Sequence, residues 1–213
     1  ADYTKGNRFY DLTHIGRMPK MRLLGNAVLS LMSKLSTGYW QLFDPTNGYT
    51  AIDARVAASL PFSRISPRYF FETDILFRLN TFRAAVVDVP MDSVYEDEKS
   101  NLRISRVLGE FLFKHLKNLS KRIFYNYFLR DMSLASLELL VGVAMLVFGV
   151  VYGSIQWHAS VVTGEPAALG TIMIASLPII SGLQFLLAFF SFDISSTPTR
   201  AVAELLGPPR EEL

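Results

Sequence analysis

Two long apolar runs near the C-terminus constrain this chain most strongly. Residues 133–155 contain one acid, Glu138, and residues 171–192 contain no charged side chain. Each run reaches the roughly 20 apolar residues that a helix needs to cross a bilayer. Buried core helices of a soluble protein are the alternative, but two adjacent runs of this length favour membrane spans. The sequence therefore predicts a two-helix transmembrane hairpin within residues 132–192.

The distribution of basic residues predicts the orientation of this hairpin. The connector, residues 156–170, contains no Lys or Arg, whereas the stretch before the first run contains several. By the positive-inside rule the connector faces outward and both ends of the chain are cytoplasmic. We therefore expect a multi-pass protein of the cell (inner) membrane. Its polar, Pro-rich cytoplasmic tail, residues 193–213, is expected to be loosely ordered.

Residues 100–131 precede the first apolar run and have apolar residues at helical spacing. The cations of this segment that we expect at the membrane surface are Arg103, Arg106, Lys114, Lys117 and Lys121. The pattern predicts a basic amphipathic juxtamembrane helix, or two, in contact with anionic head groups. A core-facing helix with a solvated basic face is the alternative, and the adjacent apolar run disfavours it.

Residues 1–99 have a mixed α/β pattern. Helices are predicted over 21–38, where Gly38 provides a stop, over 53–60 with Asp53 as N-cap, and over 68–82. Strands are predicted over 48–52 and 84–91. Two strands are few for a complete doubly wound sheet, and the chain begins without Met or a leader sequence. We therefore expect an N-terminal half to be missing.

The first candidate site is a basic cluster formed by Lys5, Arg8, Arg17 and Arg22, near a turn that contains Gly6. Guanidinium groups bind phosphate oxygens in a bidentate manner, so the cluster is a candidate phosphate site. Ordinary surface charge is the alternative.

The second candidate is the turn "DPTNGY", which places Asp44, Asn47 and Gly48 before a strand. Gly48 permits a positive φ or the close approach of a ligand, although a plain tight turn explains the same residues. The third candidate is the pair Glu72 and Asp74, at the start of a predicted helix. These acids could take a proton from an acceptor, or they could simply cap the helix, because the helix dipole stabilises negative charge near its N-terminus.

Other site classes receive no support from the sequence. The chain contains no cysteine, and its three histidines lie far apart without ligand spacing, so we predict neither disulfides nor a metal site within this chain. The formal net charge is only +2, and we expect no nucleic-acid partner. Gly149 and Gly153 form a GxxxG pattern that permits close helix approach, which leaves a homo-oligomer open.

Taken in order, these motifs resemble the C-terminal part of a family 2 glycosyltransferase. The resemblance rests on "DYTKGNRF", "DPTNGYTAI", "YFFETDILFRLN" and "VVDVPM", followed by the basic amphipathic stretch and the two apolar runs. It covers residues 2 to about 200. The nearest group is the polyprenyl-phosphate glycosyltransferases, which includes dolichol-phosphate mannose synthase.

The resemblance implies a fold and a reaction. Residues 1–99 would be the C-terminal part of a Rossmann-like GT-A domain. The complete enzyme would transfer a sugar from a nucleotide-sugar donor to undecaprenyl or dolichyl phosphate, with Mg²⁺ or Mn²⁺ at a DxD motif. No DxD motif is present in this sequence. The donor half would therefore lie elsewhere, and this fragment alone is expected to be inactive.

The resemblance also assigns roles to residues. Arg8 and Arg22 would bind the acceptor phosphate, and Asp44, Asn47 and Gly48 would lie near the reaction centre. Asp44 would be a catalytic residue that positions the phosphate or, as a second reading, acts as the base. Glu72 and Asp74 would lie at the acceptor. Two alternatives remain. One is a family 2 transferase with a hydroxyl acceptor, as in polysaccharide or glycolipid synthesis, for which Glu72 or Asp74 would be the base. The other is a non-enzymatic two-span membrane anchor or assembly module.

Overall fold

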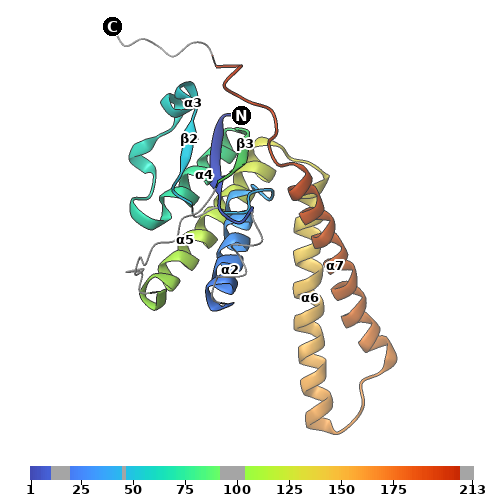
Figure 1. Ribbon diagram of the computed structural model, residues 1–213. Helices are drawn as coiled ribbons and strands as arrows, with labels where there is room; N and C mark the ends of the chain where they lie inside the picture. The colour runs from blue at the N-terminus through green and yellow to red at the C-terminus, as the bar shows by residue number, and fades with distance from the viewer. Residues whose placement is uncertain (11–19, 45–46, 92–103, 207–213) are drawn as a thin grey trace. The chain divides into compact units, whose positions relative to one another are not determined.

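The computed structural model describes residues 1–10, 20–44, 47–91 and 104–206, and side chains only outside 20–23, 69 and 104–108. The chain forms two compact units: residues 1–125 with residues from 197 onward, and residues 126–196. The described residues are mostly helical, with one small mixed sheet and two long apolar helices (Figure 1). The coarse prediction, α/β elements followed by membrane-length helices, is therefore confirmed.

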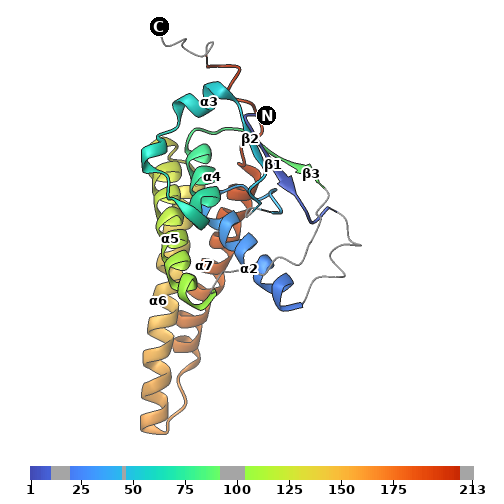
Figure 2. The same cartoon turned by 60° about the vertical axis from the view of Figure 1, so that its left-hand side comes forward.

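The first unit contains a three-stranded sheet (Figure 2). Its middle strand is β1 (Tyr3–Asn7), which pairs antiparallel with β2 (Thr50–Ile52) and parallel with β3 (Val86–Pro90). Strands β2 and β3 fall inside the predicted strands. The sequence does not predict β1, because Lys, Gly and Asn are poor strand residues. The expectation that Gly6 lies in a turn is wrong, since it lies in the central strand.

The core of the first unit joins the sheet to two helices. Tyr3 and Val86 belong to the same buried cluster as Val56 of α3 (Ala54–Ser59) and Leu76 of α4 (Phe71–Thr81). Asp53 caps α3 as predicted, accepting a hydrogen bond from the Arg55 amide at 2.9 Å. Short 3₁₀ turns, η1 (Phe62–Arg64) and η2 (Arg68–Phe70), precede α4 and make it shorter than predicted.

Helices α2 (Lys20–Thr37) and α5 (Ile104–Phe124) pack side by side (Figure 1). Their contact is polar: His115 Nδ1 lies 2.8 Å from Ser36 Oγ, and buried Arg122 donates to the Leu35 carbonyl at 2.8 Å. Gly38 ends α2 as predicted, with a φ of 77°. A side chain at Gly38 would in addition meet the Arg122 guanidinium.

The apolar side chains of these two helices face outward. The exposed fraction is 49–60% for three residues of α2 and 48–67% for three residues of α5: Leu24, Val28 and Leu31, and Leu112, Phe113 and Leu116. The helix over 21–38 is therefore confirmed, but its apolar positions do not form the core. An exposed apolar helix face of this kind marks a site of contact with lipid or protein.

The segment after the second apolar helix packs onto the first unit. The buried carboxylate of Asp2 accepts hydrogen bonds from the amides of Ala85 at 2.7 Å, Val202 at 2.8 Å and Ala203 at 2.8 Å. A hydrogen bond to a charged group stabilises a fold by about 1.5–3 kcal/mol. Ala203 is itself part of the buried core. The expectation of a loosely ordered tail is thus wrong for residues 197–206.

The second unit is a helical hairpin. It begins within the π-helical segment η3 (Tyr125–Arg130) and continues as α6 (Leu134–Thr163) and α7 (Leu169–Ser195). Both helices are longer than the predicted runs. Helix α6 continues through polar residues to Gly164, which ends it with a φ of 72°. Of the most apolar 18-residue stretch in each helix, only 22% is buried in α6 and 11% in α7. The two helices are long and apolar enough to cross a membrane.

Glycines allow α6 and α7 to approach closely. A Cβ on Gly149 would lie 2.8 Å from the Ala175 carbonyl oxygen, and a Cβ on Gly182 would lie 2.9 Å from the Gly142 carbonyl oxygen. Gly149 therefore packs inside the hairpin of one chain. Because this contact explains the GxxxG pattern, the pattern carries no argument for a homo-oligomer.

Candidate functional site

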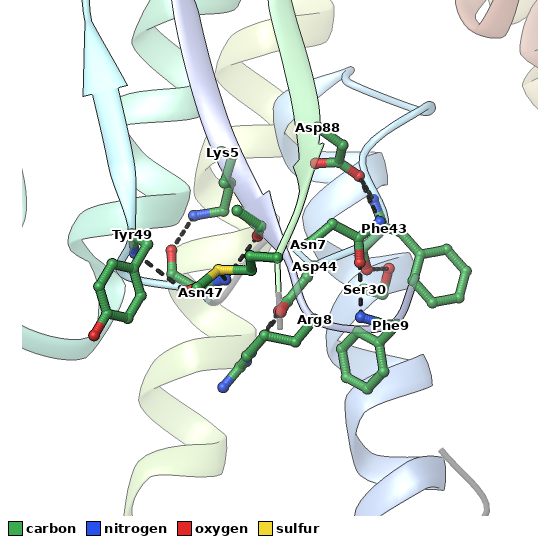
Figure 3. Close-up of polar contacts among 12 residues, drawn as sticks. Lys5, Asn7, Arg8, Phe9, Ser30, Phe43, Asp44, Asn47, Tyr49 and Asp88 are labelled. Carbon is green, nitrogen blue, oxygen red and sulfur yellow. Dashed lines mark hydrogen bonds and ion pairs between the residues drawn. The ribbon is translucent and has the colours of Figure 1, made fainter. Parts of the chain in front are cut away.

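The candidate site lies where β1 ends beside the loop that precedes β2. Arg8 and Asp44, 36 residues apart, form a bidentate ion pair in which Nε and Nη2 donate to the carboxylate at 2.7 and 3.1 Å (Figure 3). The Asp44 side chain is 1% exposed and that of Arg8 is 27% exposed. Asp44 therefore fixes the orientation of a guanidinium that solvent still reaches.

Asn47 connects the same loop to the central strand. Its Nδ2 donates to the Gly6 carbonyl at 2.7 Å, and its Oδ1 accepts the Tyr49 amide at 3.1 Å. A Cβ on Gly6 would lie 2.9 Å from Asn47 Nδ2 and would collide with the Met91 thioether. Gly6 is thus required by close packing beneath the loop.

Lys5 is fully buried in the middle of β1, and its Nζ donates to the Asn47 carbonyl at 2.5 Å (Figure 3). Burial lowers the pKa of Lys5 to about 8, opposed mainly by the nearby carboxylate of Glu72 and then by those of Asp44 and Asp88. These charges belong to four separate segments of the first unit and lie within electrostatic reach of one another.

Asn7 and Asp88 belong to the site although the sequence analysis did not select them. Asp88 Oδ2 accepts the Phe43 amide at 2.8 Å and Asn7 Nδ2 at 3.3 Å, and Asn7 Oδ1 accepts the Phe9 amide at 2.9 Å. These bonds fix the residues next to Asp44 and Arg8. Burial raises the pKa of Asp88. The signal available in the sequence was one acid inside the apolar strand "VVDVP".

Gly48 follows Asn47 in the loop and is exposed. A Cβ on Gly48 would have Glu72 Oε1 as its neighbour, at 4.0 Å, and no closer contact among the described atoms. Gly48 is not among the described glycines with positive φ, which are Gly38 and Gly164. Of the two reasons given for a glycine here, the structure excludes a positive φ, and Gly48 is exposed to solvent.

Asp74 has a different environment from Glu72, although both lie in the first turn of α4 as predicted. The buried Asp74 carboxylate accepts the Ser66 amide at 2.8 Å and Asn118 Nδ2 at 3.1 Å, and it lies 3.7 Å from Arg78. These contacts tie α4 to α5 and to the preceding loop, so they account for Asp74 as a structural residue. Its predicted role at the acceptor receives no geometric support.

The remaining basic candidates are only partly visible. Arg17 and Arg103 lie outside the described residues, and Arg22 and Arg106 belong to helices whose side chains are not described at these positions. Lys114 is paired with Glu110 at 2.7 Å and lies over the Phe70 ring. Lys117 and Lys121 are exposed on α5.

The Arg8 guanidinium is the group of this site that can bind an anion. Among the described residues no group of three or more His, Asp or Glu side chains could hold a metal. The expected Mg²⁺ or Mn²⁺ therefore has no ligand set in this part of the chain, and we derive no step through it. A partly exposed guanidinium held by a buried carboxylate is instead a preorganised donor for phosphate or carboxylate oxygens.

Comparison with known proteins adds no family to this description. No protein-family profile matches the chain, and neither curated proteins nor solved structures contain a significant match.

Proposed function

We propose that this chain belongs to a family 2 glycosyltransferase that transfers a sugar from a nucleotide-sugar donor to a polyprenyl phosphate, undecaprenyl or dolichyl, at the cytoplasmic face of the membrane. The observation that carries the proposal is the Arg8–Asp44 pair, in which a buried carboxylate holds a partly exposed guanidinium. It occurs in a chain that also has two helices of membrane-spanning length.

The chemistry requires little of the protein beyond positioning. A lipid phosphate oxygen attacks the anomeric carbon of the donor sugar, the bond from that carbon to the nucleotide phosphate breaks, and the nucleoside diphosphate leaves with the electron pair. The phosphate oxygen is already a nucleophile, so no strong base is needed. Arg8 binds and orients the acceptor phosphate, while Asp44 holds the guanidinium in place.

The exposed surface of the first unit supports a lipid acceptor. Helices α2 and α5 bury polar side chains against each other and leave leucines and Phe113 exposed. Lys117 and Lys121 are exposed on the same α5 helix. Apolar side chains flanked by cations are the pattern of a helix that lies in the membrane interface.

The test uses the full-length protein in detergent, with undecaprenyl phosphate and a panel of labelled nucleotide sugars. We expect a lipid-linked product from one donor. Arg8→Lys retains the charge but loses the bidentate pair, and Asp44→Asn loses the counter-charge, so each is expected to lower kcat/KM at least tenfold.

The matched control is Arg55→Lys. Arg55 and Asp53 form a similar ion pair, 2.9 Å long, whose side chains are both partly exposed at the start of α3. We expect this variant to retain wild-type turnover. Normal turnover in Asp44→Asn would refute the role of the Arg8–Asp44 pair.

The position of Glu72 keeps the hydroxyl-acceptor transferase as a second candidate. A hydroxyl acceptor must lose a proton, and Glu72 Oε1 lies 4.0 Å from the place that a Cβ on the exposed Gly48 would take. Loss of a general base lowers turnover by about 10²–10⁴-fold. Glu72→Gln is therefore expected to abolish transfer to a hydroxyl and to lower transfer to a phosphate only slightly.

A further inference from the structure

Lys5 occupies a position that a lysine seldom takes. It lies in the central strand of the sheet, between β2 and β3, and its side chain is fully buried. An ammonium group removed from water is costly unless hydrogen bonds and opposite charges compensate. Its presence here therefore calls for an account in terms of its partners.

The partners of Lys5 are part of the candidate site. Nζ donates to the Asn47 carbonyl at 2.5 Å, and the next residue in the strand, Gly6, accepts the Asn47 side-chain amide at 2.7 Å. The backbone N–H of Asn47 in turn donates to the Asp44 carbonyl at 3.4 Å. Two neighbouring residues of β1 thus hold Asn47 from both its backbone and its side chain, and Asn47 is joined to Asp44.

We propose that Lys5 is a positioning residue that holds the loop from Asp44 to Tyr49 on the central strand and so sets the place of the Arg8–Asp44 pair. This role rests on the proposed function only for its effect on transfer. Direct binding of the acceptor phosphate, the role expected for Lys5 from the sequence, does not fit a side chain that is 0% exposed. Lys5 therefore acts through Asn47.

The charge of Lys5 also balances the site. The charged groups that face it are Arg8 of the β1 segment, Asp44 of the loop, Glu72 of α4 and Asp88 of β3. Without the Lys5 ammonium, Arg8 would be the one remaining cation of this set beside three carboxylates, and the carboxylates would repel one another. Removal of the charge is thus expected to loosen the loop.

The experiment measures backbone hydrogen exchange in Lys5→Met. We expect exchange at the Gly6 and Tyr49 amides, which are bonded to Tyr49 O and Asn47 Oδ1, to rise at least tenfold. Exchange in α6 and α7 is expected to stay unchanged. Arg64→Met, at an exposed cation of η1 outside the candidate site, is the matched control and should match the wild type throughout.

Kinetics separate positioning from direct binding. A positioning residue predicts that kcat falls at least tenfold in Lys5→Met while KM for the lipid phosphate changes less than threefold. It also predicts that the wild-type rate falls as pH rises through about 8, where Lys5 loses its proton, and that this limb is absent from the variant. A large rise in KM with unchanged kcat would instead assign Lys5 to the phosphate.

Exchange decides the proposal without reference to activity. If Lys5→Met leaves the Gly6 and Tyr49 amides as protected as in the wild type, positioning is refuted, whether or not the protein transfers sugars. If Lys5→Met does not fold, Lys5→Gln is measured in its place. Faster exchange at these two amides supports the proposal, and protection equal to the wild type refutes it.

Discussion

Gly6 contacts the Asn47 side chain and Gly48 follows Asn47 in the chain, yet the two glycines tolerate a side chain very differently. A Cβ on Gly6 meets Asn47 and Met91, whereas a Cβ on Gly48 meets only Glu72 Oε1 at ordinary contact distance. Gly6→Ala is therefore expected to destabilise the protein by about 1–3 kcal/mol, the usual range for overpacking. The measurement is thermal unfolding in detergent, with a fall in Tm of about 2–4 °C per kcal/mol.

Gly48→Ala is the matched control for this prediction. We expect its Tm to equal that of the wild type, because the position has neither a positive φ nor a close neighbour among the described residues. Its turnover should nevertheless fall, since the added methyl group enters the space beside Glu72. An equal loss of Tm in both variants would contradict the packing described here.

Single residues show what a sequence pattern can and cannot reveal about this site. Arg8, Asp44 and Asn47 were predicted from residue type and turn chemistry, and the structure brings them together. Asp2 and Asp88 were not, because their partners are far away in sequence: Asp2 binds amides about 200 residues later. Local periodicity contains no information on such bonds.

At the scale of elements, the seam between α2 and α5 predicts a pH effect. Burial lowers the pKa of His115 to about 4, well below that of an exposed histidine. Between pH 6.5 and 4 the unfolded chain binds a proton that the folded chain does not. The free energy of unfolding therefore falls as pH decreases through this window, by up to about 3 kcal/mol at pH 4.

The measurement compares the Tm of the wild type with that of His115→Gln between pH 7 and pH 4. We expect the two curves to converge as pH falls, because only the wild type loses this contribution. His158→Gln is the control, since His158 is exposed. Parallel Tm curves for the wild type and His115→Gln would show that folding does not lower the pKa of His115.

The same seam explains why element positions were easier to predict than element faces. The spacing of Leu24, Val28 and Leu31 gives a helix correctly, but the core lies against its serines. A periodic pattern identifies an apolar stripe without saying whether protein or lipid covers it. Strand β1 was missed for a related reason: its polar residues serve the site instead of the local propensity.

At the scale of the whole molecule, the two chain segments that form the first unit limit the number of membrane crossings. This unit contains chain from both sides of the hairpin, because Asp2 binds Val202 and Ala203, and Thr197 Oγ1 donates to the Gly38 carbonyl at 3.3 Å. Segments that share one compact unit lie on one side of a membrane. The chain between them must therefore cross an even number of times, which agrees with two spans and not with one.

This constraint predicts a labelling pattern in a chain that has no cysteine of its own. Glu165→Cys, in the connector, is expected to react with an impermeant maleimide added to intact cells, whereas Glu204→Cys should react only after permeabilisation. Both side chains are exposed, so accessibility within the protein does not limit either reaction. Ala1→Cys should behave as Glu204→Cys does, because Asp2 holds residues 1 and 204 in one unit. Labelling of the connector and the tail from the same side would refute the two-span hairpin, and labelling of the tail alone from outside would invert its orientation and move the Arg8–Asp44 site away from a cytoplasmic nucleotide sugar.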